Sequence, residues 1–298
     1  MPEPHVLAEI ASQPQCWERA VELAPQHLAA LPQPGERVAA IGCGTSWFMA
    51  MAYASLREAA GLGPTDAFTA SEFPAGRGYD RVVAISRSGT TTEVADALRR
   101  LPDQTASVGL VGVAGTPVAD LADHMVLLDF ADEQSVVQTR FATTSLALLR
   151  AHLGQDLRPA IADVRAALEA EIPQRWVDAE QIAYLGAGWT VGLAQEAALK
   201  AREASQAWVE AYPAMDYRHG PIAIAQPGRL AWMFGTAPAG LAEQVRATGA
   251  EWVDDPGDPM ADLVRAQRLA VAKAQARGLD PDRPRHLTRS VVLDGVPR

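Results

Sequence analysis

Residues 38–44 read Val-Ala-Ala-Ile-Gly-Cys-Gly, and residues 182–188 read Ile-Ala-Tyr-Leu-Gly-Ala-Gly. Each stretch is a short apolar run that ends in Gly-x-Gly and leads into an alanine-rich helical pattern, which predicts a buried strand, a turn and a helix. The two stretches lie 144 positions apart (186 − 42), close to half of the 298-residue chain. This offset indicates a duplicated α/β unit.

Other segments extend the same alternation. Strands are predicted at residues 81–86, 107–113, 124–129, 230–234 and 290–293, and helices at 46–60, 91–101 and 135–153, with a helical connector over 158–180. Strands that alternate with helices at this spacing are typical of a parallel sheet covered on both faces. We therefore predict an α/β fold with two domains, residues 1–157 and 158–298.

Composition and charge limit the functional class. Hydrophobic residues make up 48% and charged residues 21%, which is normal for a globular protein. A net charge of −10 argues against broad nucleic-acid binding. Two cysteines cannot form a disulfide framework, and no Cys/His cluster has zinc spacing. We find neither a signal-peptide pattern nor a run of about 18 apolar residues, so we expect a cytoplasmic protein without membrane or metal.

The first glycine turn, Gly42-Cys-Gly-Thr-Ser46, favours an anionic ligand. Glycines let the backbone approach a ligand, and the following helix offers unpaired N–H groups. A dinucleotide fingerprint requires a third glycine at position 47, where Trp47 stands. In the second turn the third glycine, Gly192, comes one place late. We therefore expect no nicotinamide cofactor, and no other cofactor.

The stretch Ser86-Arg-Ser-Gly-Thr-Thr91 is a candidate phosphate site. It follows a buried strand at the end where open α/β sheets bind ligands. Four hydroxyl side chains within six residues, together with helix N–H groups, are suited to surrounding phosphate oxygens. No Walker lysine is present, so a sugar phosphate fits better than a nucleoside triphosphate. The alternative is that these residues only cap a helix, since Ser and Thr are good N-caps.

The block Glu196–Pro221, EAALKAREASQAWVEAYPAMDYRHGP, is the candidate acid–base segment. It holds one of only two lysines in a chain with 24 arginines. Glu196, Lys200 and Glu203 share one helix face, and two carboxylates that flank an amine suit proton transfer. The alternative is an exposed helix with ordinary ion pairs. His219 precedes Gly220-Pro221, which predicts a turn that presents its ring.

Together these blocks resemble the sugar isomerase (SIS) domain family over almost the whole chain. The match is carried by residues 43–46, 86–91, 133–144 (EQSVVQTRFATT) and 196–221. The chain looks most like the isomerase half of the glutamine–fructose-6-phosphate aminotransferases and their stand-alone isomerase, deaminase and deglycase relatives. The resemblance implies two tandem SIS subdomains, each a flavodoxin-like three-layer sandwich.

The resemblance also implies an activity. It is aldose–ketose isomerisation of a sugar 6-phosphate by proton transfer between C1 and C2, or deamination or deglycation of an amino-sugar phosphate, without glutaminase activity. The alternative is a non-catalytic sensor of sugar phosphates, which we expect to lack an intact Glu/His pair. We expect a small-molecule sugar phosphate as ligand and a homodimer with the site near the subunit interface.

Residue roles follow from the same resemblance. Glu203 is expected to move the proton, with Lys200 and Glu196 as charged neighbours. His219 is expected to open the sugar ring. Contacts to phosphate or sugar are expected from Thr45, Ser46, Ser86, Arg87, Ser88, Thr91, Val136, Gln138 and Arg289.

Two positions depart from the family pattern. Arg289 stands where the synthases have a lysine that forms an imine with the open ketose. Arginine stays protonated and does not form a Schiff base, so Lys200 is the alternative amine. Arg87 replaces the usual glutamine, and either bonds the phosphate or faces solvent.

Overall fold

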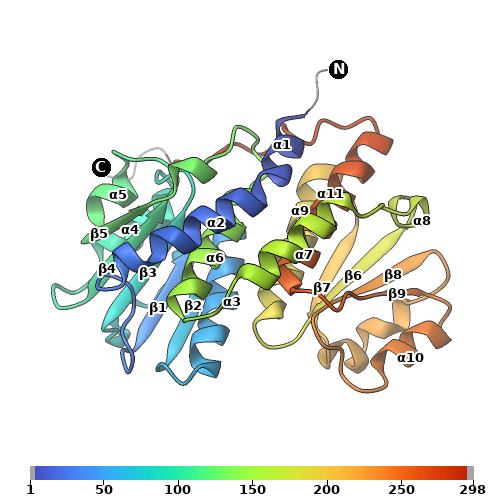
Figure 1. Cartoon of the computed structure of the whole chain (residues 1–298), viewed down its shortest axis with the longest axis horizontal. Helices are drawn as coiled ribbons and strands as arrows, with labels where there is room; N and C mark the ends of the chain where they lie inside the picture. The colour runs from blue at the N-terminus through green and yellow to red at the C-terminus, as the bar shows by residue number, and fades with distance from the viewer. Residues whose placement is uncertain (1–3, 294–298) are drawn as a thin grey trace. The chain divides into compact units, whose positions relative to one another are not determined.

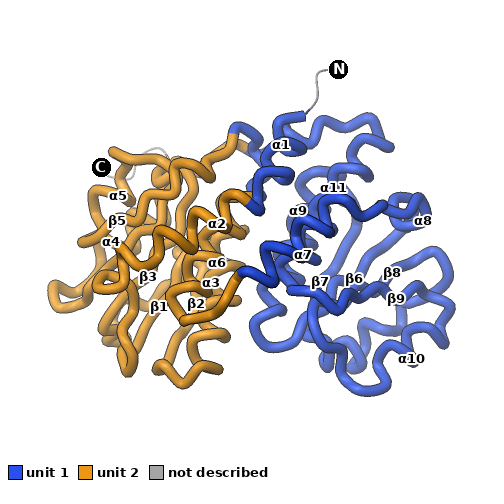
Figure 2. Tube along the Cα trace, in the orientation of Figure 1, with its two compact units in different colours: residues 1–14, 134–139, 158–287 blue, residues 15–133, 140–157, 288–298 orange. Residues whose placement is uncertain are grey.

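The computed structural model describes residues 4–293, which form two compact units (Figure 2). Unit 1 contains residues 4–14, 134–139 and 158–287, and unit 2 contains residues 15–133, 140–157 and 288–293. Each unit is therefore assembled from segments that lie far apart in the sequence. The domain division after residue 157 stays a prediction.

Unit 2 is built around a five-stranded parallel sheet (Figure 1). The strand order is β2-β1-β3-β4-β5, and every neighbouring pair is parallel. Its strands are β1 (Val38–Gly42), β2 (Thr65–Thr69), β3 (Arg81–Ser86), β4 (Ala106–Val111) and β5 (His124–Leu127). Its helices are α3 (Thr45–Ala59), α4 (Thr92–Arg99), α5 (Pro117–Leu121), α6 (Arg140–His152) and residues 15–23 of α2 (Gln13–Leu23).

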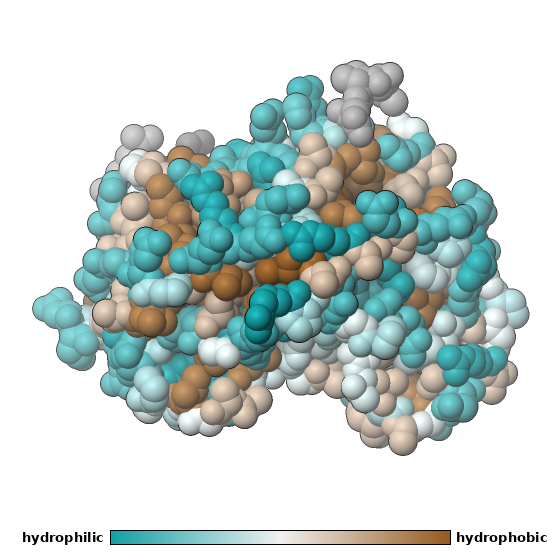
Figure 3. Space-filling view, viewed as in Figure 1, coloured by the Kyte–Doolittle hydropathy of each residue, from teal (hydrophilic) through white to brown (hydrophobic). Residues whose placement is uncertain are grey.

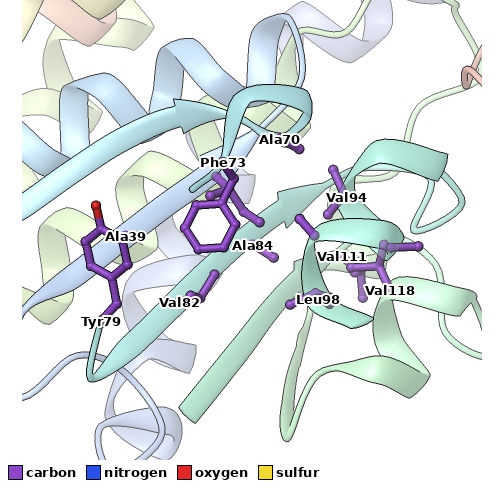
Figure 4. Packing of buried hydrophobic residues seen from close by; sticks show 13 residues of the cluster. Ala39, Ala70, Phe73, Tyr79, Val82, Ala84, Val94, Leu98, Val111 and Val118 are labelled. Carbon is purple, nitrogen blue, oxygen red and sulfur yellow. The ribbon is translucent and has the colours of Figure 1, made fainter. Parts of the chain in front are cut away.

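Both faces of this sheet are covered. One face packs against α4 and α5 through a cluster that includes Ala39, Ile41, Val82, Ala84, Val94, Leu98 and Val118 (Figure 4). The alternate residues of β1 and β3 point to the other face, where Val38, Ala40, Val83 and Ile85 are equally inaccessible to solvent. Helix α3 contacts β1 and β2, and it packs on α6. Strands buried on both faces read as continuous apolar runs, which is why the sequence revealed them.

Unit 1 repeats this plan with four strands. The order is β7-β6-β8-β9, all parallel, which matches β2-β1-β3-β4 of unit 2. Its strands are β6 (Gln181–Gly186), β7 (Val209–Pro213), β8 (Arg229–Phe234) and β9 (Glu251–Val253). Its helices are α1 (His5–Ala11), α7 (Arg158–Glu169), α8 (Gln174–Val177), α9 (Thr190–Ser205), α10 (Leu241–Ala247) and α11 (Pro259–Ala276). The predicted class, two α/β subdomains with parallel sheets, is confirmed.

The glycine turn is also repeated. A Cβ on Gly42 would lie 2.7 Å from the carbonyl carbon of Ser46, and a Cβ on Gly186 would overlap Thr190 and lie 2.6 Å from the amide nitrogen of Val191. Thr190 lies 144 positions after Ser46, the same offset as between the two glycines. Only glycine lets the first helical turn pack this closely on the strand end. The predicted duplication therefore extends to individual contacts.

Three predicted elements are wrong or displaced. The helix predicted over 135–153 begins at Arg140, because the N–H of Arg140 donates to the Glu133 carboxylate (2.9 Å) instead of to the carbonyl oxygen of Val136. Residues 290–293 form no strand. The connector predicted over 158–180 is interrupted, because α7 ends at Glu169 and α8 begins only at Gln174, directly after Pro173.

Asp282 fixes the start of unit 1. Its carboxylate accepts hydrogen bonds from the N–H groups of His5 (2.7 Å) and Val6 (2.9 Å) at the first turn of α1. The carbonyl oxygen of Asp282 accepts from the N–H of Val136 (3.0 Å). One residue therefore joins α1 and the 134–139 segment to the loop after α11.

The core of unit 1 contains a buried acid. The carboxylate of Asp262 on α11 accepts a hydrogen bond from Trp232 Nε1 (2.9 Å) and lies 2.9 Å from Arg265 Nη2. Burial raises the pKa of Asp262 to about 6, although Arg265 and the Trp232 hydrogen bond oppose the shift.

Polar and apolar residues are intermixed on the face of the molecule that Figure 3 shows. Exposed large apolar side chains in the described residues include Trp208, Met215 and Val292. Between residues 4 and 293 no helix has the length and apolar character needed to cross a membrane.

Candidate functional site

Each unit carries one group of candidate residues. In unit 2 the turns after β1 and β3 lie at the same edge of the sheet, because these two parallel strands are direct neighbours. Thr45 and Ser46 begin α3 after the first turn, and both are buried. Ser86–Thr91 follows β3. The carboxyl edge of a parallel sheet is the usual ligand-binding edge of open α/β folds.

Hydroxyl groups gather within the Ser86–Thr91 turn. Gly89 has a φ of +65°, and its N–H donates to Ser86 Oγ at 3.2 Å. Ser88 Oγ accepts from the N–H of Thr90 at 3.2 Å and lies 3.1 Å from Thr90 Oγ1. Thr91 is the N-cap residue of α4, yet its side chain makes no capping hydrogen bond. The Thr91 hydroxyl therefore does not cap α4, and for this residue the alternative of a purely capping role is wrong.

The C-terminal segment of unit 2 contacts this turn. Ser290 Oγ lies 3.1 Å from Ser88 Oγ and 3.0 Å from Thr90 Oγ1. The N–H of Thr92 donates to the carbonyl oxygen of Val291 at 3.2 Å. The serine hydroxyl thus completes a cluster of three hydroxyl groups at the start of α4.

The two arginines that depart from the family pattern both make ion pairs. Arg87 is buried, with Nη1 3.7 Å from Glu133 Oε2, and its Nη2 donates to the carbonyl oxygen of Arg289 at 3.0 Å. The alternative that Arg87 faces solvent is wrong. The guanidinium of Arg289 contacts the carboxylate of Asp132 and the carbonyl oxygen of Glu133. Carboxylates therefore balance both positive charges next to the turn.

In unit 1 the predicted helix face exists on α9. Lys200 Nζ contacts the carboxylate of Glu203 and lies 3.6 Å from Glu196 Oε1. The side chains of Glu196 and Lys200 are 0% and 1% exposed, whereas that of Glu203 is 18% exposed. The alternative of an exposed ion-paired helix is wrong, because two of the three groups are buried. Glu203 alone of the three keeps a carboxylate partly open to solvent.

The remaining candidates of unit 1 lie on irregular segments. Val136 and Gln138 belong to the 134–139 segment, and Gln138 Nε2 is buried without a hydrogen-bond partner among the described residues. His219 ends the 3₁₀ helix η5 (Asp216–His219), and its side chain is exposed. Gly220 follows with a φ of +149°, so the predicted turn is present. Between residues 4 and 293, no group of three or more His, Cys, Asp or Glu side chains is arranged to hold a metal ion.

Three residues next to the candidates were missed in the sequence. Glu133 opens the block EQSVVQTRFATT and pairs with Arg87, and Ser290 follows Arg289 in the tail. Both lie inside quoted stretches, so proximity to a candidate was the available signal. Glu9, which holds the N–H groups of Gln134 and Ser135, gave no signal, since it lies on an ordinary amphipathic helix 125 positions away.

Known proteins similar to this chain are phosphosugar enzymes. No protein-family model matches it. It is 26% identical to the isomerizing glutamine–fructose-6-phosphate aminotransferase of Methanothermobacter thermautotrophicus over 97% of this chain, and 30% identical to that of Aeropyrum pernix over 98%. The chain spans 57% and 58% of the lengths of these two relatives.

Solved structures share the fold. Glucosamine-6-phosphate deaminase from Thermotoga maritima superposes with a TM-score of 0.78 and 24% identity, over 96% of this chain and 99% of that one. Tagatose-6-phosphate ketose/aldose isomerase from Escherichia coli superposes with a TM-score of 0.79 and 18% identity, over 92% and 94% of the two chains. The arrangement of two parallel sheets flanked by helices is thus one that solved enzymes of this kind share.

Proposed function

We propose that this chain is a member of the sugar isomerase (SIS) domain family and an enzyme that acts on a phosphorylated sugar or amino sugar. The proposed reaction is proton transfer between C1 and C2 of a ketose or aldose 6-phosphate, alone or coupled to deamination or deglycation. The observation that carries the proposal is the Glu203 carboxylate on α9, which is held by the buried Lys200 and remains partly open to solvent.

The geometry around Glu203 suits a proton carrier. A base that removes a proton next to a carbonyl must reach the substrate, and its carboxylate must stay ionised until it does so. The Lys200 ammonium holds the Glu203 carboxylate in an ion pair, while the partly exposed side chain gives access. One carboxylate on one face of the substrate takes the proton from one carbon and returns it to the next. We propose Lys200 and Glu196 as the groups that orient and charge-balance Glu203.

We assign phosphate recognition to the Ser86–Thr91 turn of unit 2. Its three-hydroxyl cluster offers donors to a dianion at the start of α4, and helix N-termini commonly bind anions. Thr45 and Ser46, at the same sheet edge, are proposed further donors. We propose that Arg87 and Arg289 attract the phosphate by their charge and do not bond it directly, because each already pairs with a carboxylate.

Deuterium exchange tests the proposal. The protein is incubated in deuterated water with fructose 6-phosphate, glucosamine 6-phosphate or fructosamine 6-phosphate, and NMR follows both deuterium at C1 and C2 and the products. We expect exchange with at least one of them, and its loss in Glu203→Gln with little change in ligand affinity. Binding without any exchange would instead support the non-catalytic sensor.

Ser88→Ala separates binding from chemistry. Removing one hydroxyl of the cluster should weaken sugar-phosphate binding about tenfold, corresponding to one lost hydrogen bond of roughly 1.4 kcal/mol, and leave exchange at saturation almost unchanged. Isothermal titration calorimetry measures the affinity. Thr236→Ala, a hydroxyl deletion in unit 1 outside the candidate residues, is the control and should bind normally.

We also propose a homodimer and ring opening by His219. His219 is exposed, which suits a group that works at a subunit surface. Sedimentation equilibrium tests the dimer. His219→Asn should slow turnover of cyclic fructose 6-phosphate, and leave turnover unchanged for 5-deoxyfructose 6-phosphate, which cannot close a furanose ring.

A further inference from the structure

A small cavity in unit 1 opens beside Glu203. It has a volume of about 220 Å³ and is lined by Arg202, Glu203 and Gln206 at the end of α9 and by residues 285–287. A second cavity of about 150 Å³, lined in part by Asp280 and Arg283, also reaches Glu203. The proposed proton carrier therefore lies in the wall of both.

Backbone strain is concentrated at the first of these cavities. Among residues 4–293, the non-glycine residues with positive φ are Gln206 (54°) and His286 (64°), and both line it. Gln206 has an ordinary reason, since it ends α9 in the left-handed conformation common at helix C-termini. His286 ends no helix. Sparsely populated backbone conformations gather at functional sites.

His286 occupies a turn position that suits glycine. The N–H of Leu287 donates to the carbonyl oxygen of Pro284 at 3.4 Å, which makes His286 the third residue of a four-residue turn. A positive φ at this place favours Gly or Asn, and an imidazole there costs roughly 1 kcal/mol. A side chain held in this conformation at the wall of a cavity is a candidate for a functional role.

The proposed reaction gives an imidazole in this cavity a chemical role. Moving a carbonyl from C2 to C1 relocates one carbon-bound proton and one oxygen-bound proton, and Glu203 accounts for only the first. Arg202 and Arg285 stay protonated and cannot relay a proton. Leu287 is apolar and Gln206 is an amide. Among the other residues that line the cavity, only His286 has a side chain that can both accept and donate a proton, through its two ring nitrogens.

We propose that His286 is a second acid–base residue of this enzyme and moves the proton between the two substrate oxygens; this rests on the proposed function. Glu203 takes the proton from C1 of the ketose while the His286 imidazolium gives a proton to O2, forming a neutral enediol. Neutral His286 then takes the proton from O1 as Glu203 returns its proton to C2. The carbonyl is now at C1, both residues regain their starting states, and no oxidant or cofactor is consumed.

Glycine and asparagine substitutions at position 286 separate this role from a structural one. His286→Gly and His286→Asn both suit the positive φ, so the thermal midpoint should stay equal or rise. Turnover should fall about a hundredfold, in the range of lost general acid–base catalysis. The amount of C1 deuterium exchange per product formed should rise, because Glu203 still works. Free imidazole should restore part of the turnover in His286→Gly.

The measurement uses fructose 6-phosphate or glucosamine 6-phosphate, whichever the unchanged protein converts. His5→Asn is the matched control, since His5 is an exposed histidine of unit 1 outside this cavity, and it should behave as the parent. If Glu203→Gln is inactive but both position-286 variants keep parental turnover, only the role of His286 is overturned. If the parent converts neither of these sugars nor fructosamine 6-phosphate, or Glu203→Gln keeps full exchange, the proposed function fails and the His286 role with it.

Discussion

Lys200→Met is the most direct test of the charge arrangement on α9. The substitution keeps a side chain of similar length and removes the ammonium, which leaves Glu196 at 0% exposure without its cation 3.6 Å away. At an effective dielectric constant of about 20, that attraction amounts to about 4–5 kcal/mol. Breaking a buried pair by removing one partner commonly costs about 3–5 kcal/mol. We expect the free energy of unfolding of unit 1 to fall by about 4 kcal/mol.

A double-mutant cycle identifies the cause of the loss. Adding Glu196→Gln to Lys200→Met removes the buried carboxylate that has lost the Lys200 ammonium and should recover about 2 kcal/mol. Lys273→Met is the matched control, because Lys273 Nζ donates to the carbonyl oxygens of Val177 and Ala179 rather than to a carboxylate. Glu196→Gln should not rescue it.

Urea denaturation followed by tryptophan fluorescence provides the assay. Unit 1 holds five of the seven tryptophans, so the signal reports mainly on its unfolding. A loss of less than about 1 kcal/mol in Lys200→Met would refute the assigned ion pair. So would an equal effect of Glu196→Gln on the free energy of unfolding in the Lys200→Met and Lys273→Met backgrounds.

Three further predictions concern stability. Burial raises the pKa of Asp262 from 3.8 to about 6, so the buried anion destabilises the folded state above pH 6 but not below about pH 4. The stability of Asp262→Asn relative to the parent should therefore rise by up to about 3 kcal/mol between pH 4 and 7, and a difference in thermal midpoint that does not change with pH would contradict this. Gly186→Ala should cost about 2–4 kcal/mol in chemical denaturation, whereas Gly278→Ala, at a position with a φ of +67° where a Cβ meets no atom within 4 Å, should cost about 1 kcal/mol. Equal losses would exclude the close approach as the cause. Glu9→Ala should expose the amides of Gln134 and Ser135 to hydrogen exchange at least tenfold faster, and unchanged protection would show that the Glu9 carboxylate does not hold them.

The central strands could be predicted from the sequence, whereas three of the four edge strands could not. Strand β3 matches its predicted range, and β1, β4 and β6 differ by one or two residues, because each is an apolar run bounded by turn residues. The strands β2, β7 and β9 were missed. All three lie at sheet edges, where a strand pairs with another strand on one side only. The sequence of β2 is Thr-Asp-Ala-Phe-Thr, and β9 has three residues. No apolar run or regular alternation marks such strands.

For the candidate residues, the sequence predicted the shared helix face but not the burial of the side chains. The 3.6-residue spacing placed Glu196, Lys200 and Glu203 on one face, as the structure has them. That two of them are buried depends on the packing of α9 against α11 and the sheet, which no local pattern reveals. The ion pair of Arg87 likewise joins residues 46 positions apart. The roles assigned to these side chains stay predictions.

The Asp282 cap of α1 bears on how this protein is made. The first helix of the chain receives its N-terminal hydrogen bonds from a residue 277 positions later. On the ribosome all five strands of unit 2 have emerged before the first strand of unit 1 is synthesised. Helix α1 must then wait, uncapped and without α11 to pack on, until α11 and Asp282 have been synthesised. A segment made before every strand of both units thus reaches its native place only after all of them have been made.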